Sequence, residues 1–377
     1  MKYLSSVLIF TTLVFFVFSC NKEDDASSSN FHTPCETVID NWEIKVLPLP
    51  EIQRQNDFFF TSDETGYTVG DAGTILKTTN GGEDWKFVER YYDLTTSSIV
   101  KDALTKARLT KVFFVGEAIG YVGGEAENIP ISGGNLDAVL LKTTDGGNTW
   151  SKQYLPEIRA VKDLYFFDSN NGLAIFLVYD ENNFLKHKLF VTHDAGVSWE
   201  AVSMPNLTIQ SSQIDIHNTS VGIWVVENYT SSKYLRSADQ GATWQEIPIP
   251  SNECNWVAFK SEELGFANCD GKSFKTTDGG NSWVEITDHT VDRAALEHFY
   301  TESEGFAIVP VYDYKSGGGE GWQELNSFEV YQTKDGGINW KKSLIDKECD
   351  FTGKSFFLSN EVFYTLGNRA VNKFTRQ

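Results

Sequence analysis

One eight-residue pattern occurs six times in this chain of 377 residues and limits what the chain can fold into. The pattern is Ser or Thr, any residue, Asp, any residue, Gly, any residue, Thr or Ser, and Trp. Its copies begin at residues 78, 143, 192, 237, 276 and 333. The first copy departs from it with Asn80 and Asp84, and the last with Asn339. Such a repeat predicts an array of similar units that bury their faces against their neighbours.

Each copy is expected to form a hairpin turn, because short apolar runs precede most copies and strand-like runs follow several of them. Asp suits a turn because its carboxylate accepts backbone N–H groups, and Gly supplies a positive φ. Trp provides an apolar body that packs between units. An alternative role is catalysis or metal binding, but one role repeated six times favours a scaffold. The structural residues are Asn80, Asp145, Asp194, Asp239, Asp278 and Asp335, with Trp85, Trp150, Trp199, Trp244, Trp283 and Trp340.

The repeats resemble the Asp-box, also called the bacterial neuraminidase repeat. Consecutive repeat tryptophans are separated by 39 residues (Trp244 to Trp283) to 65 residues (Trp85 to Trp150). These distances bracket the length of one four-stranded propeller blade. After the sixth copy, residues 352–377 supply three further strands, and the strand near 42–47 has no unit of its own. The sequence therefore predicts an all-β fold, a single seven-bladed β-propeller over 41–377 closed by the N-terminal strand. A short helix is compatible with 98–109.

The N-terminus has the features of an export signal. A charged start, a short apolar run and a small residue before Cys20 are typical of a secretory signal, and residues 17–20 resemble a bacterial lipobox. We assign 1–19 to a lipoprotein signal peptide, Cys20 to lipidation and 20–40 to a flexible tether. An ordinary signal peptide with a chance cysteine is the alternative. The acidic residues 23–25 resemble a surface-export signal, which predicts a surface-exposed outer-membrane lipoprotein; a solvated charged tether is the alternative.

Four other cysteines remain, and an even number in an exported chain suggests disulfides with three possible pairings. Cys254 and Cys269 flank one predicted inner hairpin and so fall on adjacent strands. Cys35 precedes the closing strand and Cys349 precedes the blade that this strand completes. We therefore predict the pairs Cys254–Cys269 and Cys35–Cys349.

The formal net charge of −20 argues against nucleic acid and anionic membranes as partners. The six histidines have no spacing typical of metal ligands, so neither a metal nor a cofactor is expected. We expect the protein to contact a membrane only through the lipid anchor. We also expect it to be monomeric. An unknown protein or a glycan remains as the partner.

The long connecting segments, 89–108, 123–137, 179–187 and 311–327, all fall on the end of the blades opposite the Asp-boxes. Insertions concentrated on one face predict the working surface. Trp322 belongs to no Asp-box and lies in a Gly-rich loop, where it either stacks on a ligand or packs over the rim. The binding residues proposed on this face are Tyr91, Tyr92, Glu125, Asp180, Glu181, Tyr312, Asp313, Tyr314, Glu320 and Trp322.

The runs of Lys-Thr-Thr-Asp-Gly-Gly-Asn at 142–148 and 275–281, with second strands that begin Gly-Tyr or Gly-Phe, resemble the propellers of photosystem II assembly and stability factors. That resemblance implies an assembly chaperone that holds partner proteins and has no catalytic residues. The Asp-box also occurs in sialidases, so the alternative is a sialidase-like or other propeller glycoside hydrolase or lyase. The arginines are scattered and no Arg-Ile-Pro motif is present. The leading hypothesis is therefore a non-catalytic binding or assembly scaffold on the cell envelope.

Overall fold

The computed structural model describes residues 37–39, 42–50, 54–88, 91–93, 107–126, 137–153, 155, 157–203, 207–209, 214–217, 220–227, 231–287, 296–299, 301, 303–317, 320–346, 354–359, 361–367 and 370–377. The chain divides into two units, Met1–Thr33 and Pro34–Gln377, and all the described residues belong to the second. Cys20, Cys35, Cys349 and the predicted signal peptide lie outside the described residues.

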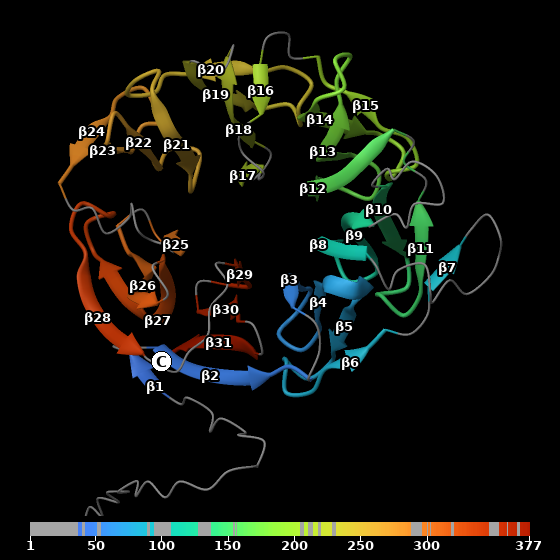
Figure 1. Cartoon of the computed structure of the whole chain (residues 1–377), viewed down its shortest axis with the longest axis horizontal. Coiled ribbons are helices and arrows are strands. Elements are labelled where there is room, and N and C mark those ends of the chain that lie inside the picture. Colours follow the sequence, from blue (N-terminus) through green and yellow to red (C-terminus); the bar gives the residue numbers. More distant parts are fainter. Residues whose placement is uncertain are drawn as a thin grey trace, which may run out of the picture. The chain divides into compact units, whose positions relative to one another are not determined.

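Seven sheets form a closed ring, which confirms the seven-bladed β-propeller (Figure 1). Blade one comprises β3 (Gln55–Phe60), β4 (Gly66–Gly70), β5 (Ile75–Thr78) and β6 (Lys86–Phe87). Blade two comprises β8 (Ala107–Val115), β9 (Ile119–Ala126), β10 (Asp137–Thr143) and β11 (Trp150–Gln153), and β7 (Tyr91–Asp93) adds a parallel fifth strand beside β11. Blade three comprises β12 (Ile158–Phe166), β13 (Gly172–Tyr179), β14 (Leu185–Thr192) and β15 (Glu200–Ala201).

Blade four pairs both β16 (Leu207–Ile209) and β17 (Asp215–His217) with β18 (Ser220–Glu227), followed by β19 (Ser231–Ser237) and β20 (Gln245–Ile247). Blade five comprises β21 (Cys254–Phe259), β22 (Gly265–Cys269), β23 (Lys272–Thr276) and β24 (Val284–Ile286). Blade six comprises β25 (Leu296–Phe299), β26 (Gly305–Gly317), β27 (Glu320–Thr333) and β28 (Lys341–Asp346). The innermost strands of the ring are β3, β8, β12, β17, β21, β25 and β29 (Figure 1).

The N-terminal strand closes the ring as predicted. Blade seven comprises β29 (Lys354–Phe357), β30 (Val362–Leu366) and β31 (Ala370–Arg376), and β2 (Trp42–Pro48) pairs along the whole of β31. A further strand, β1 (Thr37–Ile39), pairs with β2 and falls within the span 20–40 that the sequence assigned to the tether. Closure of this kind joins an N-terminal and a C-terminal strand of the propeller in one sheet and leaves no open ring edge.

The core lies between the blades, where aromatic and aliphatic side chains from adjacent sheets meet. Trp150 of blade two is 1% exposed and packs with Tyr67 and Ile75 of blade one, and Trp85 of blade one packs with Tyr364 of blade seven. The repeat tryptophans therefore join neighbouring units. Cys254 and Cys269 are paired across β21 and β22 and are bonded by a disulfide.

All four long segments contain more strand than the sequence suggested, and within 89–108 residues 91–93 form β7 and residues 107–108 begin β8. Residues 311–327, expected as a loop, lie mostly in β26 and β27, because the antiparallel pairing continues past a register shift between Val311 and Tyr312 to Gly317 and Glu320. The loop expected over 179–187 shrinks to the turn between Tyr179 and Leu185. The ends of 123–137 belong to β9 and β10. The helix considered over 98–109 falls mainly outside the described residues, and its last three residues belong to β8.

Candidate functional site

Each Asp-box turn contains a hydrogen-bonding network that explains the Ser/Thr, Asp and Gly positions of the pattern. In blade two the Gly147 N–H donates to Thr143 Oγ1 (2.9 Å), and this hydroxyl donates to Asp145 Oδ1 (2.8 Å). The Thr149 N–H and hydroxyl donate to the two Asp145 oxygens at 2.9 and 2.6 Å. Both carboxylate oxygens are thereby used inside the turn, which is a structural role.

The two departures from the pattern keep the same network with exchanged groups. In the first repeat Asn80 accepts the Asp84 N–H, and its amide donates to Asp84 Oδ2 at 2.9 Å. In the last repeat the Asn339 amide donates to Asp335 Oδ2 at 2.8 Å. A carboxylate therefore always meets an N–H or O–H donor, although in the first repeat the charge has moved from position 80 to position 84.

Hydrogen bonds also keep the Asp-box carboxylates ionised. The Ser198, Thr243 and Ser282 hydroxyls donate to Asp194, Asp239 and Asp278 and lower the pKa of each carboxyl to about 2. A catalytic acid at neutral pH requires the opposite shift. Among the described residues no group of three or more His, Cys, Asp or Glu side chains is arranged to hold a metal ion.

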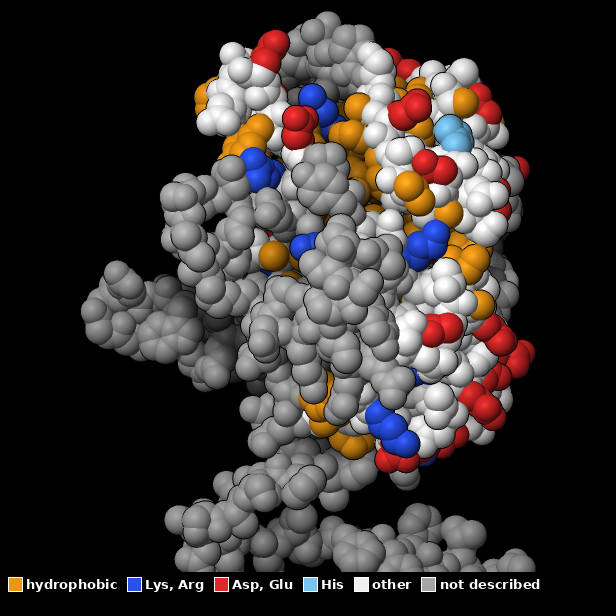
Figure 2. All heavy atoms as spheres, turned by 90° about the vertical axis from the view of Figure 1, so that its right-hand side faces the viewer, with side chains coloured by type: hydrophobic (Ala, Val, Ile, Leu, Met, Phe, Trp, Pro, Cys, Tyr) orange, Lys and Arg blue, Asp and Glu red, His pale blue; other side chains and the backbone are white. Residues whose placement is uncertain are grey.

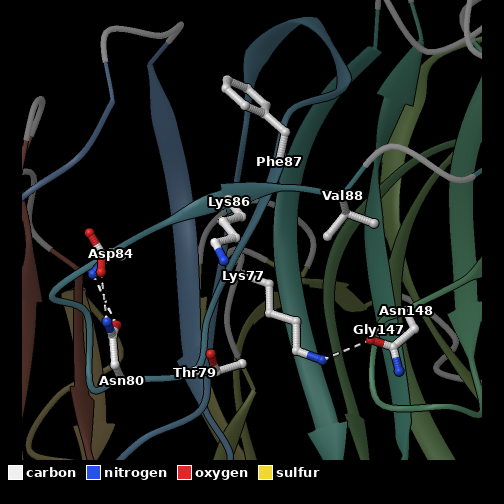
Figure 3. A pocket seen from close by; sticks show the side chains of 9 residues that line it. All are labelled: Lys77, Thr79, Asn80, Asp84, Lys86, Phe87, Val88, Gly147 and Asn148. Carbon is white, nitrogen blue, oxygen red and sulfur yellow. Dashed lines mark hydrogen bonds between the residues drawn. The ribbon is translucent and has the colours of Figure 1, made fainter.

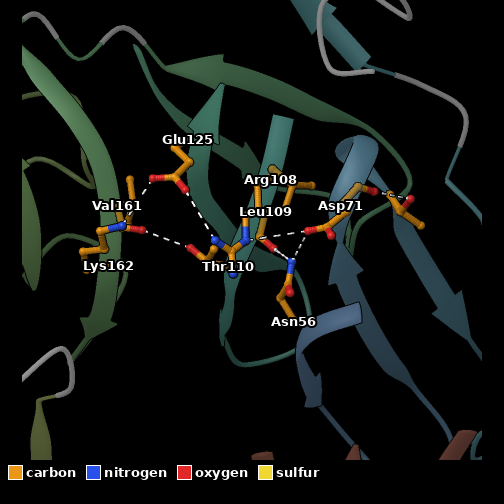
Figure 4. A network of polar contacts seen from close by, with 9 residues as sticks. Asn56, Asp71, Arg108, Leu109, Thr110, Glu125, Val161 and Lys162 are labelled. Atoms are coloured by element: carbon orange, nitrogen blue, oxygen red, sulfur yellow. Dashed lines mark hydrogen bonds and ion pairs between the residues drawn. The ribbon is translucent and has the colours of Figure 1, made fainter. Parts of the chain in front are cut away.

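The opposite end of the blades, here called the long-loop face, carries a network of charged side chains across blades one to three (Figure 4). Glu125, proposed from the sequence as a binding residue, accepts from Lys162 Nζ at 3.2 Å and lies 3.8 Å from Arg108 Nη1. Arg108 Nε also lies 3.7 Å from Asp71 Oδ1. The Glu125 carboxylate is therefore held between cations from two blades, in an arrangement that fixes its orientation.

A second carboxylate on the long-loop face has a turn-forming role. Asp180 Oδ1 accepts the N–H groups of Asn182 and Phe184 at 3.0 and 2.8 Å. Glu181, beside it, is exposed, and Phe184 is 65% exposed at the same turn. The Arg159 guanidinium lies 4.9 Å from the Tyr179 ring centroid. The blade-three hairpin thus presents a rigid turn with an exposed aromatic side chain.

The other proposed binding residues lie in strands. Tyr91 and Tyr92 belong to β7, opposite Trp150 and Ser151 of β11. Tyr312, Asp313 and Tyr314 belong to β26, and Glu320 and Trp322 to β27, where Trp322 is opposite Lys315. Together with Asp180 and Glu181 of blade three, the proposed binding residues therefore lie on separate elements of blades two, three and six.

Charged side chains on the innermost strands, two of them buried carboxylates, were not predicted from the sequence. Lys111 of β8 donates to Asp163 of β12 at 2.8 Å, and Asp57 of β3 accepts the Val112 N–H at 3.0 Å. Burial alone would lower the pKa of Lys111, but the Asp163 and Asp57 carboxylates raise it above its ordinary value. Each of these residues occupies the position just before the buried apolar end of its inner strand. An alignment of the repeats would have shown that charged residues recur at this position.

The surface formed by blades two and three carries scattered acidic side chains with isolated basic ones (Figure 2). Among the described residues no helix is long and apolar enough to cross a membrane.

Sequence comparison finds two family models that match parts of the chain. Residues 35–158 match the model described as photosynthesis system II assembly factor YCF48, and residues 138–270 match the model of sortilin, neurotensin receptor 3. The chloroplastic photosystem II stability/assembly factor HCF136 of Arabidopsis thaliana is 23% identical over 355 residues, covering 88% of this chain and 78% of that protein. The photosystem II assembly lipoprotein Ycf48 of a Synechococcus strain is 20% identical and covers 86% of each chain.

Structure comparison agrees with the sequence comparison. A solved structure described as YCF48 bound to D1 peptide superposes with a TM-score of 0.62 at 18% identity, covering 92% of this chain and all of that one. That likeness establishes the fold. The repeats, the ring of seven blades and both comparisons agree. This chain is a seven-bladed Asp-box β-propeller similar to the photosystem II assembly factors.

Proposed function

We propose that this protein is a non-catalytic scaffold that binds a segment of a partner protein on its long-loop face and is held at the cell envelope by a lipid on Cys20. The observation that carries the proposal is similarity over nearly the whole propeller to assembly factors, one of which is described with a bound peptide. The same relatives include a protein named as a lipoprotein, which supports the anchor.

The polar groups of the long-loop face support binding over catalysis. The Glu125 and Asp180 carboxylates are both engaged, by cations of neighbouring strands and by turn N–H groups. A general acid or base needs a carboxyl that can exchange a proton with the substrate. Groups held in this manner instead give a rigid polar surface with fixed charges, which suits recognition of a partner.

The charge of the chain selects the kind of partner. With a net charge of −20, the scaffold favours a segment that is neutral or basic, since like charges repel and opposite charges steer association. The elements that we assign to contact it are the β26–β27 hairpin, with Tyr312, Tyr314 and Trp322, and the blade-three turn around Glu181. Aromatic side chains are the commonest anchors of such interfaces.

The test uses a photo-crosslinking amino acid at position 322 in intact cells, followed by binding measurements with the purified partner. We expect Trp322→Ala to weaken binding while the melting temperature stays nearly unchanged. Phe87→Ala is the matched control, because Phe87 is 53% exposed on an outer strand far from this hairpin in the ring (Figure 1). Equal binding by the parent and the Trp322 variant, or a large loss of stability, would remove the hairpin from the site.

The anchor has its own test. Cys20→Ser is expected to release the protein from membranes or block its processing, and protease treatment of intact cells then reports whether the propeller faces outward from the outer membrane. A variant that fractionates with membranes like the parent would contradict lipidation at Cys20.

A further inference from the structure

A hollow of about 360 Å³ lies between the first and second Asp-box turns, on the opposite side from the long-loop face (Figure 3). It is lined by Lys77, Lys86, Thr79 and Asp84 of blade one and by Asn148 of blade two, among others. The hollow is polar and contains two lysines in a protein whose acidic residues exceed its basic ones by 20. Nothing in the scaffold role on the long-loop face uses it.

The two lysines are directly opposite each other on neighbouring strands. Lys77 of β5 pairs with Lys86 of β6, so their side chains leave the sheet on the same face. Like charges in directly opposite positions are destabilising. Such a pair therefore lowers the stability of the blade unless an anion lies between or beside the two ammonium groups.

Blade seven also places two lysines at this position, Lys373 opposite Lys45, but there the Lys45 ammonium pairs with the Glu83 carboxylate of the next Asp-box. For blade one, the residue at the position of Glu83 in the next Asp-box is Asn148, which has no charge. In the other five blades the corresponding pairs contain at most one cation: Lys142 with Ser151, Val191 with Glu200, Arg236 with Gln245, Lys275 with Val284 and Gln332 with Lys341. The equivalent hollow between blades four and five is instead lined by Glu262, Glu263 and Asp278 beside Arg236. Among the described blades, a lysine pair with no carboxylate at the position of Glu83 is therefore specific to blade one and is not a requirement of the repeat.

One of the two lysines is held in place and the other is exposed. Lys77 Nζ donates to Gly146 O at 2.7 Å and to Asn148 Oδ1 at 3.2 Å, which directs it across the junction (Figure 3). Lys86 is exposed and forms no ion pair with the other residues that the structure describes. The acidic residue that lines the hollow, Asp84, accepts a hydrogen bond from the Asn80 amide. A fixed cation and an adjacent exposed cation form a preorganised receptor for one anionic group.

We propose that this hollow binds the oxyanion of a small ligand, a carboxylate or sulfate group such as acidic saccharides carry. The Lys86 ammonium forms the charged contact, and the Thr79 hydroxyl provides a further hydrogen bond at the same wall. Lys77 acts as a positioning residue, since its bonds to Gly146 and Asn148 keep both turns in register. An oxyanion there offsets the Lys77–Lys86 repulsion, so binding also stabilises blade one.

The test titrates purified full-length protein with glucuronate, sulfate and, as the uncharged match, glucose, with heteronuclear NMR as the readout. We expect glucuronate and sulfate to shift the Lys86, Thr79 and Asn148 signals, and glucose to leave them unchanged. Glucuronate binding much tighter than sulfate would indicate a saccharide ligand; the reverse order would indicate a sulfated one. Shifts that are equal for all three solutes, or spread evenly over the surface lysines, would overturn the proposal.

A matched pair of variants distinguishes binding at this site from a general effect of surface charge. Lys86→Gln is expected to weaken glucuronate binding by about tenfold, the value of one charge-assisted contact. Lys341→Gln removes the lysine at the corresponding place in blade six, which faces Gln332, and is expected to leave binding unchanged. Without ligand, Lys86→Gln should not lower the melting temperature, because it removes repulsion. Equal weakening by both variants, or by neither, would mean an adventitious ion only.

Discussion

The junctions that join blade one to two and two to three differ chemically from the junction that joins blade three to four. In the first two, a tyrosine and a lysine of one blade donate to one carbonyl of the next Asp-box. Tyr67 Oη and Lys77 Nζ each reach Gly146 O at 2.7 Å, and Tyr121 Oη and Lys142 Nζ reach Ala195 O at 3.1 and 2.9 Å. The positions of Tyr121 and Lys142 are taken in blade three by Leu173 and Val191.

The apolar junction reaches the same geometry by close packing. Leu173 is fully buried in a cluster with Val221 and Ile223 of blade four, and it fills the space over Gly241. Polar latches hold a blade through a few directional bonds, whereas this junction depends on the buried area of many side chains. One fold thus tolerates two ways of closing the same gap, and their sensitivity to mutation should differ.

The largest difference is expected for the repeat tryptophans. Trp150 is 1% exposed between blades one and two. Its replacement by alanine should lower the free energy of unfolding by about 3–5 kcal/mol. Trp244, only partly buried beside the blade-three to blade-four cluster, should cost clearly less. Urea denaturation followed by circular dichroism measures both, and equal losses would show that the two junctions are equally packed.

The glycines under the two junctions come next. A Cβ on Gly147 would lie 2.5 Å from Tyr67 Cε1, in a ring that is stacked on Phe114 and bonded to Gly146. A Cβ on Gly241 would meet Leu173 Cδ2 at 2.9 Å, and this methyl group can rotate away. Both glycines have positive φ, so both alanine variants are strained. We expect Gly147→Ala to be the less stable by about 1–2 kcal/mol; the opposite order in thermal unfolding would contradict a rigid latch.

A smaller effect is expected for the latch hydroxyl. Tyr121→Phe removes one of the two donors to Ala195 O and should cost about 0.5–1.5 kcal/mol. Combining it with Lys142→Met should give a loss that differs from the sum, since the two donors share an acceptor. Leu173→Met is the matched change at the apolar junction and should cost less than about 1.5 kcal/mol. Strict additivity of the double variant would refute a shared latch.

The smallest effect concerns acid. The folded-state pKa of Asp239 is about 2, below the ordinary value of 3.8, because the Thr243 hydroxyl and N–H donate to it. The stability that this carboxylate contributes is therefore full above about pH 4 and disappears as the pH falls through 2. The difference in unfolding free energy between parent and Asp239→Asn should shrink between these pH values. A difference that is constant with pH would mean that the Asp-box bonds do not depend on ionisation.

The sequence allowed a prediction of the number of blades, the closing strand and the proximity of Cys254 to Cys269. These features depend on local signals that recur at regular spacing, namely turn residues, a buried Trp and alternating apolar runs. The pairing of Cys35 with Cys349 stays a prediction, since both residues lie outside the described part. Residues 311–327 were expected as a loop but extend β26 and β27, because loops and extended strands have similar composition there. The role of the proposed binding residues stays a prediction.

By itself, the sequence determined the repeat unit and therefore the ring, since a unit with one Asp-box turn and one inner hairpin buries its faces only between two copies. Tertiary structure decided which side chains meet across the junctions. The Lys77–Lys86 pair, the Glu125 network and the Lys111–Asp163 bridge join residues whose partners are set by register and by blade order. No local pattern encodes such contacts, because they arise only when the ring has brought separate strands together.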